Sequence, residues 1–244
     1  MATVMWGAEA AARYDAAGTE MFDPAVLGPA VDMLEELAAG GPALEFAIGT
    51  GRIALPLAAR GVDVAGIELS RAMVARLRAK PGGADIPVVI GDMSSATIDG
   101  PFSLVYLVYN TIENLTAQDE QVAVFANAAA HLRPGGRFLL EVEVPSVPRI
   151  PPGERGRIFH LSPTHAGIDT HDDPVGQLMS SHHWTLLDGQ WVQASGQYRY
   201  VWPSELDLMA RLAGLRFEAR WAGWDRSPFT AASPSQVVVY AKPA

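Results

Sequence analysis

Two apolar segments, separated by a glycine-rich turn and a short helical stretch, constrain the fold of this chain most strongly. The first segment, residues 44–46, leads into Gly49 and Gly51, and the second, residues 64–67, ends at Glu68. Glycines in such a turn let the backbone approach a ligand closely because they carry no Cβ. An acid at the end of the following strand can accept both hydroxyls of a ribose. The pattern therefore predicts an α/β unit that binds a nucleoside.

The glycine series distinguishes between two classes of cofactor. A dinucleotide-binding turn reads G-x-G-x-x-G, whereas this chain has Ala47, Gly49 and Gly51, with Arg52 three residues after Gly49. Glu45 adds a carboxylate four residues before Gly49, and this charge would repel a pyrophosphate. It suits a ligand with a cationic amine, and S-adenosylmethionine has that amine, a sulfonium and a ribose, but no phosphate. The turn therefore favours S-adenosylmethionine over NAD.

At these residues the chain resembles the class I S-adenosylmethionine-dependent methyltransferases. In that family a glycine-rich motif closes the first strand, an acid closes the second, an acid follows the third, and a Leu-x-Pro-Gly-Gly turn announces the fifth. The counterparts here stand in the same order: residues 45–51, Glu68, Gly91-Asp92-Met93 and residues 132–136. Ala47 stands where the first glycine is usual, which resembles the variant in amino-sugar N-methyltransferases.

The resemblance implies an α/β fold: a Rossmann-like sheet, mostly parallel with an antiparallel last strand, and helices on both faces. Three segments are expected. Residues 1–144 form the cofactor-binding core, 145–202 an antiparallel β insertion over the acceptor site, and 203–244 the final helix and two strands. The insertion is predicted from Asp188-Gly189, which stands between two alternating stretches and is a strong hairpin signal.

Several helix boundaries are marked by capping residues. Asp23 followed by Pro24 predicts a helix start, and Val26 should belong to the apolar face of that helix. Ser70 predicts the start of another helix. Thr116 and Asp119 have the spacing of a capping box with Asp in place of Glu. We therefore expect a helix to begin after Thr116.

By the same resemblance, Glu68 would bind the ribose, Asp92 the adenine amino group, and Tyr14 would close over the methionine moiety. Each has an alternative role: Asp92 as a turn residue, Tyr14 as a core aromatic, and Asn110 as a turn former. The expected cofactor-binding residues are Tyr14, Glu45, Ala47, Gly49, Gly51, Glu68, Leu69, Asp92, Met93, Tyr109 and Asn110.

Methyl transfer is an in-line displacement in which the protein mainly supplies alignment and desolvation. Asn110 follows the fourth predicted strand and is a candidate for the methyl-transfer centre. His182 and His183 are candidates for a general base, and alternation along a strand sends them to opposite faces. The histidines of the insertion match no metal-ligand spacing, and we expect a solvated polar segment and no metal.

Composition limits the partners. A net charge of −9 argues against nucleic acid, which is bound by clustered Lys and Arg. The chain has no cysteine, no apolar run long enough to span a membrane, and no secretory signal pattern. We expect a cytoplasmic monomer or homodimer acting on a small-molecule acceptor, at nitrogen more than oxygen. An NAD-dependent oxidoreductase and a non-catalytic S-adenosylmethionine-binding protein are the alternatives.

Overall fold

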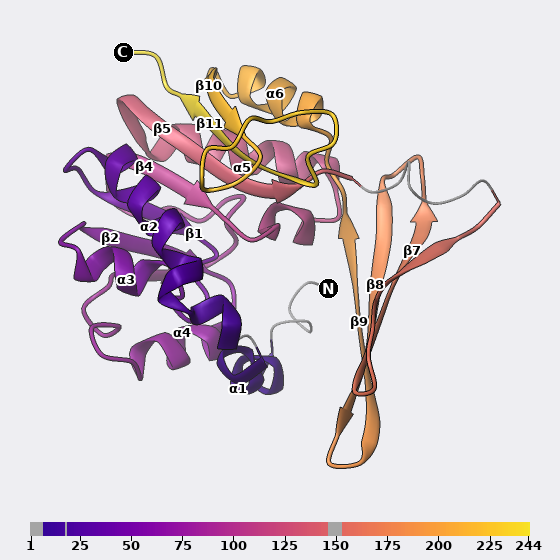
Figure 1. Ribbon diagram of the computed structural model, residues 1–244. Helices are drawn as coiled ribbons and strands as arrows, with labels where there is room; N and C mark the ends of the chain where they lie inside the picture. The colour runs from indigo at the N-terminus through magenta and orange to yellow at the C-terminus, as the bar shows by residue number, and fades with distance from the viewer. Residues whose placement is uncertain (1–6, 18, 146–152) are drawn as a thin grey trace.

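The computed structural model describes residues 7–17, 19–145 and 153–244, which build two β-sheets flanked by helices (Figure 1). The larger sheet has seven strands in the order β10-β11-β5-β4-β1-β2-β3. Only β11 runs antiparallel to its neighbours, β5 and β10. The expected mostly parallel sheet with an antiparallel last strand is therefore confirmed. The smaller sheet has the antiparallel order β6-β7-β8-β9.

The strands of the larger sheet are β1 (Ala43–Phe46), β2 (Val64–Glu68), β3 (Val88–Ile90), β4 (Phe102–Leu107), β5 (Leu132–Glu143), β10 (Arg216–Trp221) and β11 (Ser235–Ala241). The strands of the smaller sheet are β6 (Gly156–Leu161), β7 (His165–Asp173), β8 (Leu178–Leu187) and β9 (Gln190–Arg199). The helices are α1 (Ala8–Ala17), α2 (Pro24–Ala38), α3 (Ala54–Ala59), α4 (Arg71–Arg78), α5 (Gln118–His131) and α6 (Pro203–Leu212), with 3-10 turns η2 (Thr19–Phe22) and η3 (Thr111–Asn114). Within the described ranges, no helix is long and apolar enough to cross a membrane.

Helices pack on both faces of the larger sheet, and each face has its own apolar core. On one face Phe125 of α5 and Met209 of α6 pack against Phe138 and Tyr240. On the other, Leu34 of α2 and Leu57 of α3 belong to a second buried cluster. Every residue of β1, β2 and β4 is buried, as expected for central parallel strands covered on both sides.

The capping signals predicted two helix starts correctly and placed a third one residue too early. Asp23 accepts a hydrogen bond from the Ala25 N–H, and Ser70 accepts one from the Met73 N–H. Thr116, however, is not a cap: α5 begins one residue later, and the Ala117 N–H donates to Glu120. Glu120 at the third helical position favours this frame because it is the usual capping-box acid. Val26 is 56% exposed, so the apolar face of α2 is narrower than predicted.

The smaller sheet stands beside the core as a long twisted ribbon (Figure 1). Its predicted hairpin is confirmed: β8 and β9 pair along their whole length, and Asp188 and Gly189 turn with φ of 49° and 78°. Two consecutive positive φ values define a type I′ turn. Gly167 in β7 leaves room for an aromatic ring, because a Cβ there would lie 2.3 Å from Phe159.

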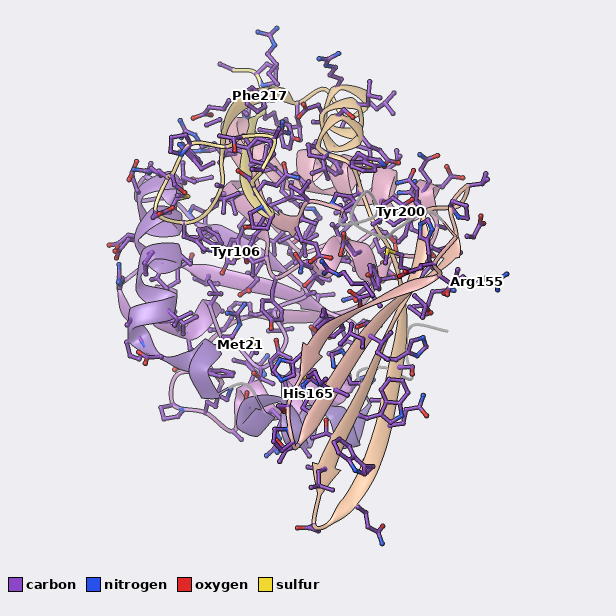
Figure 2. The ribbon with its side chains drawn as sticks, turned by 45° about the vertical axis from the view of Figure 1, so that its right-hand side comes forward. Met21, Tyr106, Arg155, His165, Tyr200 and Phe217 are labelled. Atoms are coloured by element: carbon purple, nitrogen blue, oxygen red, sulfur yellow. The ribbon has the colours of Figure 1, made fainter. Side chains whose placement is uncertain are left out.

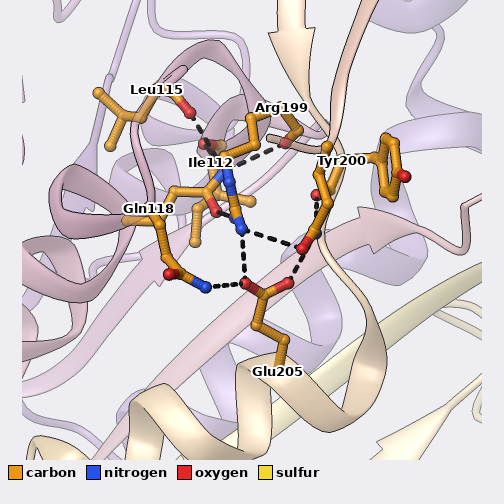
Figure 3. A network of polar contacts seen from close by, with 8 residues as sticks. Ile112, Leu115, Gln118, Arg199, Tyr200 and Glu205 are labelled. Atoms are coloured by element: carbon orange, nitrogen blue, oxygen red, sulfur yellow. Dashed lines mark hydrogen bonds and ion pairs between the residues drawn. The ribbon is translucent and has the colours of Figure 1, made fainter. Parts of the chain in front are cut away.

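A buried polar network attaches the end of β9 to the core (Figure 3). Arg199 forms an ion pair with Glu205 of α6 at 2.7 Å and donates hydrogen bonds to Gln121 of α5 and to Gln177. Gln118 of α5 and Gln177 also donate to Glu205. The network therefore fixes the base of the ribbon relative to two core helices.

Candidate active site

A cavity of about 630 Å³ lies between the carboxyl ends of the parallel strands and one face of the smaller sheet. Ligands bind at this edge in open α/β sheets, because loops rather than paired backbone surround it. The core side includes Glu68, Asp92 and Asn110, and the ribbon side includes Asp169 and His183. Of the predicted site residues, those lining the cavity are Tyr14, Ala47, Gly49, Glu68, Leu69, Asp92, Met93, Tyr109, Asn110 and His183.

Glu68 lines the cavity, and two backbone N–H groups fix its carboxylate. Its Oε2 accepts a hydrogen bond from the Gly49 N–H at 2.8 Å, and its Oε1 accepts one from the Ser70 N–H at 2.7 Å. Burial raises the pKa of Glu68, and these backbone donors oppose the shift. The two N–H groups fix the orientation of the carboxylate. Each oxygen retains lone-pair capacity for a second donor such as a ribose hydroxyl.

The turn after β1 uses the left-handed backbone region three times. Ala47, Gly49 and Gly51 have φ of 53°, 59° and 80°. Glycine adopts this region freely, whereas an L-residue with a Cβ is disfavoured there. Gly51 does not line the cavity: a Cβ on it would lie 2.4 Å from a methyl of Leu77, so this glycine serves close helix packing.

Glu45 lies beneath the turn and does not line the cavity. The buried carboxylate accepts a hydrogen bond from the Tyr106 hydroxyl at 3.0 Å. Burial raises the pKa of Glu45 to about 8, while this hydrogen bond and the charge of Arg52 oppose the shift. Its predicted contact with a cofactor amine stays a prediction.

Asp92 and Met93 lie together at the cavity wall after β3. Oδ1 of Asp92 accepts hydrogen bonds from the Ser94 N–H and hydroxyl, at 2.8 and 2.7 Å. The proposed turn role of Asp92 is therefore present in the structure. Because Asp92 lines the cavity, the same carboxyl group is also placed to bind adenine, and that role stays a prediction.

Helix α1 closes one side of the cavity through Tyr14. The helix is attached to the glycine-rich turn by Asp15, which accepts a hydrogen bond from the Thr50 hydroxyl at 2.7 Å and pairs with Lys80 at 2.9 Å. Lys80 also donates to the Thr50 carbonyl at 2.8 Å. These contacts tie α1 to the turn that Gly49 belongs to, so Tyr14 has a defined place over the site.

The loop after β4 lines the cavity and is held in a strained backbone conformation. Tyr109 and Asn110 have φ of 60° and 56°, which is uncommon for residues other than glycine and costly for a bulky one. The end of β5 compensates: Glu141 accepts the Tyr109 N–H at 2.9 Å, and Asn110 Oδ1 accepts the Glu143 N–H at 2.8 Å. Asn110 therefore positions Glu143 through its side-chain oxygen.

The two candidate histidines separate as the alternation predicted. His183 lines the cavity, whereas His182 does not and instead contacts Ser195 and Thr170, at 2.8 and 3.1 Å. His183 Nδ1 lies 3.1 Å from His165 Nε2, and its Nε2 lies 3.2 Å from the Ser181 hydroxyl. Burial lowers the pKa of His183, as does the neighbouring charge of His165. Figure 2 shows His165 on the ribbon that carries this pair.

Three carboxyl groups that sequence reasoning did not select also line the cavity: Glu113, Glu143 and Asp169. Burial raises the pKa of all three; the charge of Asp169 also raises the pKa of Glu113 and Glu143, and that of Glu143 raises the pKa of Glu113. Glu113 is 4% exposed, and its Oε1 has no hydrogen-bond partner among the described residues. Arg157 adds one guanidinium to the same wall. No group of three or more ligands suited to a metal occurs in the described part of the chain.

Weak signals for these carboxyl groups exist in the sequence. Glu113 stands between Ile112 and Leu115 just after a predicted strand, and Glu143 is at the end of the next one. Both positions lie at the carboxyl edge of a parallel sheet, where ligands bind. Asp169 and Arg157 carry no local signal, because only the pairing of β6 with β7 brings them together.

The comparison with known families gives one domain match. Residues 43–136 match the model of a methyltransferase domain. This segment contains the glycine-rich turn, Glu68, Asp92 and Glu113, and thus most of the core side of the cavity.

Two curated relatives extend this match. The chain is 27% identical to the cypemycin N-terminal methyltransferase of a Streptomyces species, over 93% of this chain and 96% of that one. It is 33% identical to the dTDP-4-amino-2,3,4,6-tetradeoxy-D-glucose N,N-dimethyltransferase of Saccharopolyspora spinosa, over 40% of this chain and 39% of that one.

Among solved structures, the CcbJ methyltransferase from Streptomyces caelestis superposes with a TM-score of 0.84 and 33% sequence identity, covering 98% of both chains. The likeness therefore includes the ribbon as well as the core.

Proposed function

The chain belongs to the class I S-adenosylmethionine-dependent methyltransferases, and from that premise we propose that it methylates a nitrogen atom of a small-molecule acceptor. Its cofactor is S-adenosylmethionine, and the NAD-dependent alternative is set aside. Two relatives named above are N-methyltransferases, one of a peptide N-terminus and one of an amino sugar. Their names support a nitrogen acceptor without specifying it.

The residues on the core side of the cavity fit the cofactor. The buried carboxylate of Glu68 matches a ribose diol, the apolar side chain of Met93 matches an adenine ring, and Asp92 matches the exocyclic amine. When bound, S-adenosylmethionine supplies a methyl group made electrophilic by its sulfonium. Tyr14 would cover the amino-acid end of the cofactor, and Glu45 would contact its amine through a bridging water, since the carboxyl group lies beneath the turn.

The observation that carries the nitrogen assignment is the acidic wall formed by Glu113, Glu143 and Asp169. Among the described residues, the wall has three carboxyl groups and only one guanidinium. When ionised, the carboxylates favour a cationic ligand, because opposite charges attract strongly in a partly buried cavity. An amine is cationic in water, whereas an alcohol is neutral. The unpartnered Oε1 of Glu113 adds a buried acceptor that an ammonium N–H would satisfy.

An ammonium must lose one proton before its nitrogen can attack a methyl carbon. The carboxyl groups have pKa values raised by burial, which makes their ionised forms better bases. Asp169 interacts with the Ser181 hydroxyl, and Ser181 contacts His183. We assign proton acceptance to this Asp169–Ser181–His183 group, with desolvation and alignment by the cavity as the larger contribution.

Residues 145–202 would form the acceptor-binding insertion, with 1–144 and 203–244 forming the cofactor-binding core. A cytoplasmic location and a monomeric or dimeric state stay predictions.

The test is a turnover assay on matched acceptor pairs that differ only in an amine or a hydroxyl at one carbon. S-adenosylhomocysteine release is measured for each member with wild-type protein and with Glu113→Gln. We expect turnover of the amine member, with the variant reduced. Turnover of the alcohol members alone would contradict the nitrogen assignment.

A further inference from the structure

Arg157 is the one arginine or lysine among the described residues that line the cavity, and its placement is determined by strand pairing. Arg157 of β6 lies directly opposite Asp169 of β7, which lies opposite Ser181 of β8, which in turn lies opposite Gly196 of β9. All four residues of this row line the cavity. Side chains opposite one another in an antiparallel sheet lie on the same face and contact each other.

Arg157 has a donor without a partner. Its Nε is buried and makes no hydrogen bond to any described residue, although its charge lowers the pKa of Glu143 and Asp169. A buried N–H that has lost water and gained no acceptor is costly. Glu113, which lines the same cavity, has an acceptor without a donor, its Oε1. One ligand with both a donor and an acceptor would satisfy both groups.

Asp169 links the two unpartnered groups, Arg157 Nε and Glu113 Oε1. Asp169 stands opposite Arg157 in the sheet, and its charge also raises the pKa of Glu113. An ammonium bound between Glu113 and Asp169 would therefore lie beside the residue that stands opposite Arg157 in the sheet. The acceptor group that Arg157 requires must then be attached close to the nitrogen that is methylated.

The charge of the wall selects the kind of acceptor group. In their ionised forms, three carboxyl groups outnumber the one guanidinium, so a ligand carboxylate would be repelled by Glu113, Glu143 and Asp169. A neutral carbonyl oxygen accepts a hydrogen bond from Arg157 without that repulsion. We propose that this cavity binds an amine with a neutral carbonyl group beside the reactive nitrogen, with Arg157 as the residue that selects the carbonyl.

This inference rests on the proposed nitrogen acceptor, and binding probes separate the two. The probe is L-alaninamide, which has both an ammonium and a carbonyl. Two analogues remove one group each: 2-aminobutane lacks the amide group with its carbonyl, and isobutyramide lacks the ammonium. L-alanine replaces the neutral carbonyl with a carboxylate. Dissociation constants are measured by NMR titration of the protein saturated with S-adenosylhomocysteine.

We expect L-alaninamide to bind wild-type protein about tenfold more tightly than 2-aminobutane, the range of a hydrogen bond to a charged group. L-alanine should also bind more weakly than L-alaninamide. Arg157→Met should remove the difference between L-alaninamide and 2-aminobutane, and Arg157→Lys should restore part of it. The control is Arg155→Met, because Arg155 is exposed and does not line the cavity (Figure 2).

The outcomes are distinguishable. Equal binding of L-alaninamide and 2-aminobutane to wild-type protein, or a difference that survives in Arg157→Met, would overturn the carbonyl site while leaving the ammonium site intact. Isobutyramide binding as tightly as L-alaninamide would instead contradict the ammonium site and thus the proposed function. Absence of L-alaninamide binding at millimolar concentration would overturn the inference. If L-alanine binds more tightly than L-alaninamide, the neutral-carbonyl assignment is wrong.

Discussion

The carboxylate of Glu68 accepts the backbone N–H of Gly49 at 2.8 Å, which joins the end of β2 to the turn after β1. The second oxygen of the same carboxylate accepts the Ser70 N–H at the start of α4. One side chain thus fixes the strand end, the turn and the helix start around the cavity. The arrangement combines a structural role and a ligand-binding role in one residue.

Replacing Glu68 should therefore affect both roles. We expect Glu68→Gln to weaken S-adenosylhomocysteine binding about tenfold or more, because one charged acceptor for a hydroxyl becomes an amide. The free energy of unfolding should fall by about 1–3 kcal/mol, since the amide NH₂ would face a backbone N–H. Calorimetric titration and urea unfolding measure the two effects. Unchanged affinity with lowered stability would leave Glu68 with the structural role alone.

Glu45 gives the fold a dependence on pH. Burial raises the pKa of Glu45 from 4.5 to about 8, so the folded chain binds more protons than the unfolded chain between these values. Stability should then fall as pH rises through this window, on the order of 1 kcal/mol per pH unit. Glu45→Gln should remove the share of this loss that comes from Glu45, leaving the shares of the other buried carboxyl groups.

Urea unfolding at about pH 5 and about pH 9 compares the wild type with that variant. The exposed Glu154→Gln is the control and should behave like wild type. A wild-type stability that does not change between the two pH values would contradict a buried Glu45 with a raised pKa.

The ion pair of Arg199 with Glu205 should stabilise the attachment of the ribbon. Its side chains are 5% and 13% exposed, against 33% and 36% for the pair Arg137 with Glu218. Arg199→Met leaves a buried charge unpaired and should cost about 3–5 kcal/mol, whereas Arg137→Met should cost about 0–1 kcal/mol. Urea unfolding compares them, and hydrogen exchange in β8 and β9 reports whether the ribbon loosens. Equal losses would contradict the role of the network.

The two adjacent histidines should differ in turnover. His183 lines the cavity beside Ser181, and His182 faces Thr170 and Ser195. If the Asp169–Ser181–His183 group accepts the proton, His183→Gln should lower kcat by about 10²-fold or more, with little change for His182→Gln. The pH profile of kcat should also change only in the first variant. Small and equal losses would leave alignment and desolvation as the whole mechanism.

The sequence predicted the core more completely than the acceptor side. The glycine-rich turn, Glu68 and the Asp188-Gly189 hairpin are local patterns whose backbone requirements show in the residues themselves. Thr116 shows the limit of such patterns: Glu120, one position further along than Asp119, shifted the cap to Ala117.

The acidic wall was not predictable in the same way. Glu113, Glu143 and Asp169 come from three separate segments and meet only in the folded chain. The position of Arg157 opposite Asp169 depends on the register of β6 with β7, which includes a bulge and has no hairpin signal of its own. A one-residue slip would place Arg157 on the other face.

The most direct measurement of the central claim uses one acceptor that offers both kinds of nucleophile. L-serinamide, which has a primary amine, a neutral carbonyl group and a free hydroxyl group, is incubated with the protein and S-adenosylmethionine labelled with ¹³C in its methyl group, and the product is examined by NMR. We expect the label to appear only as an N-methyl signal. An O-methyl signal on the same molecule would contradict it.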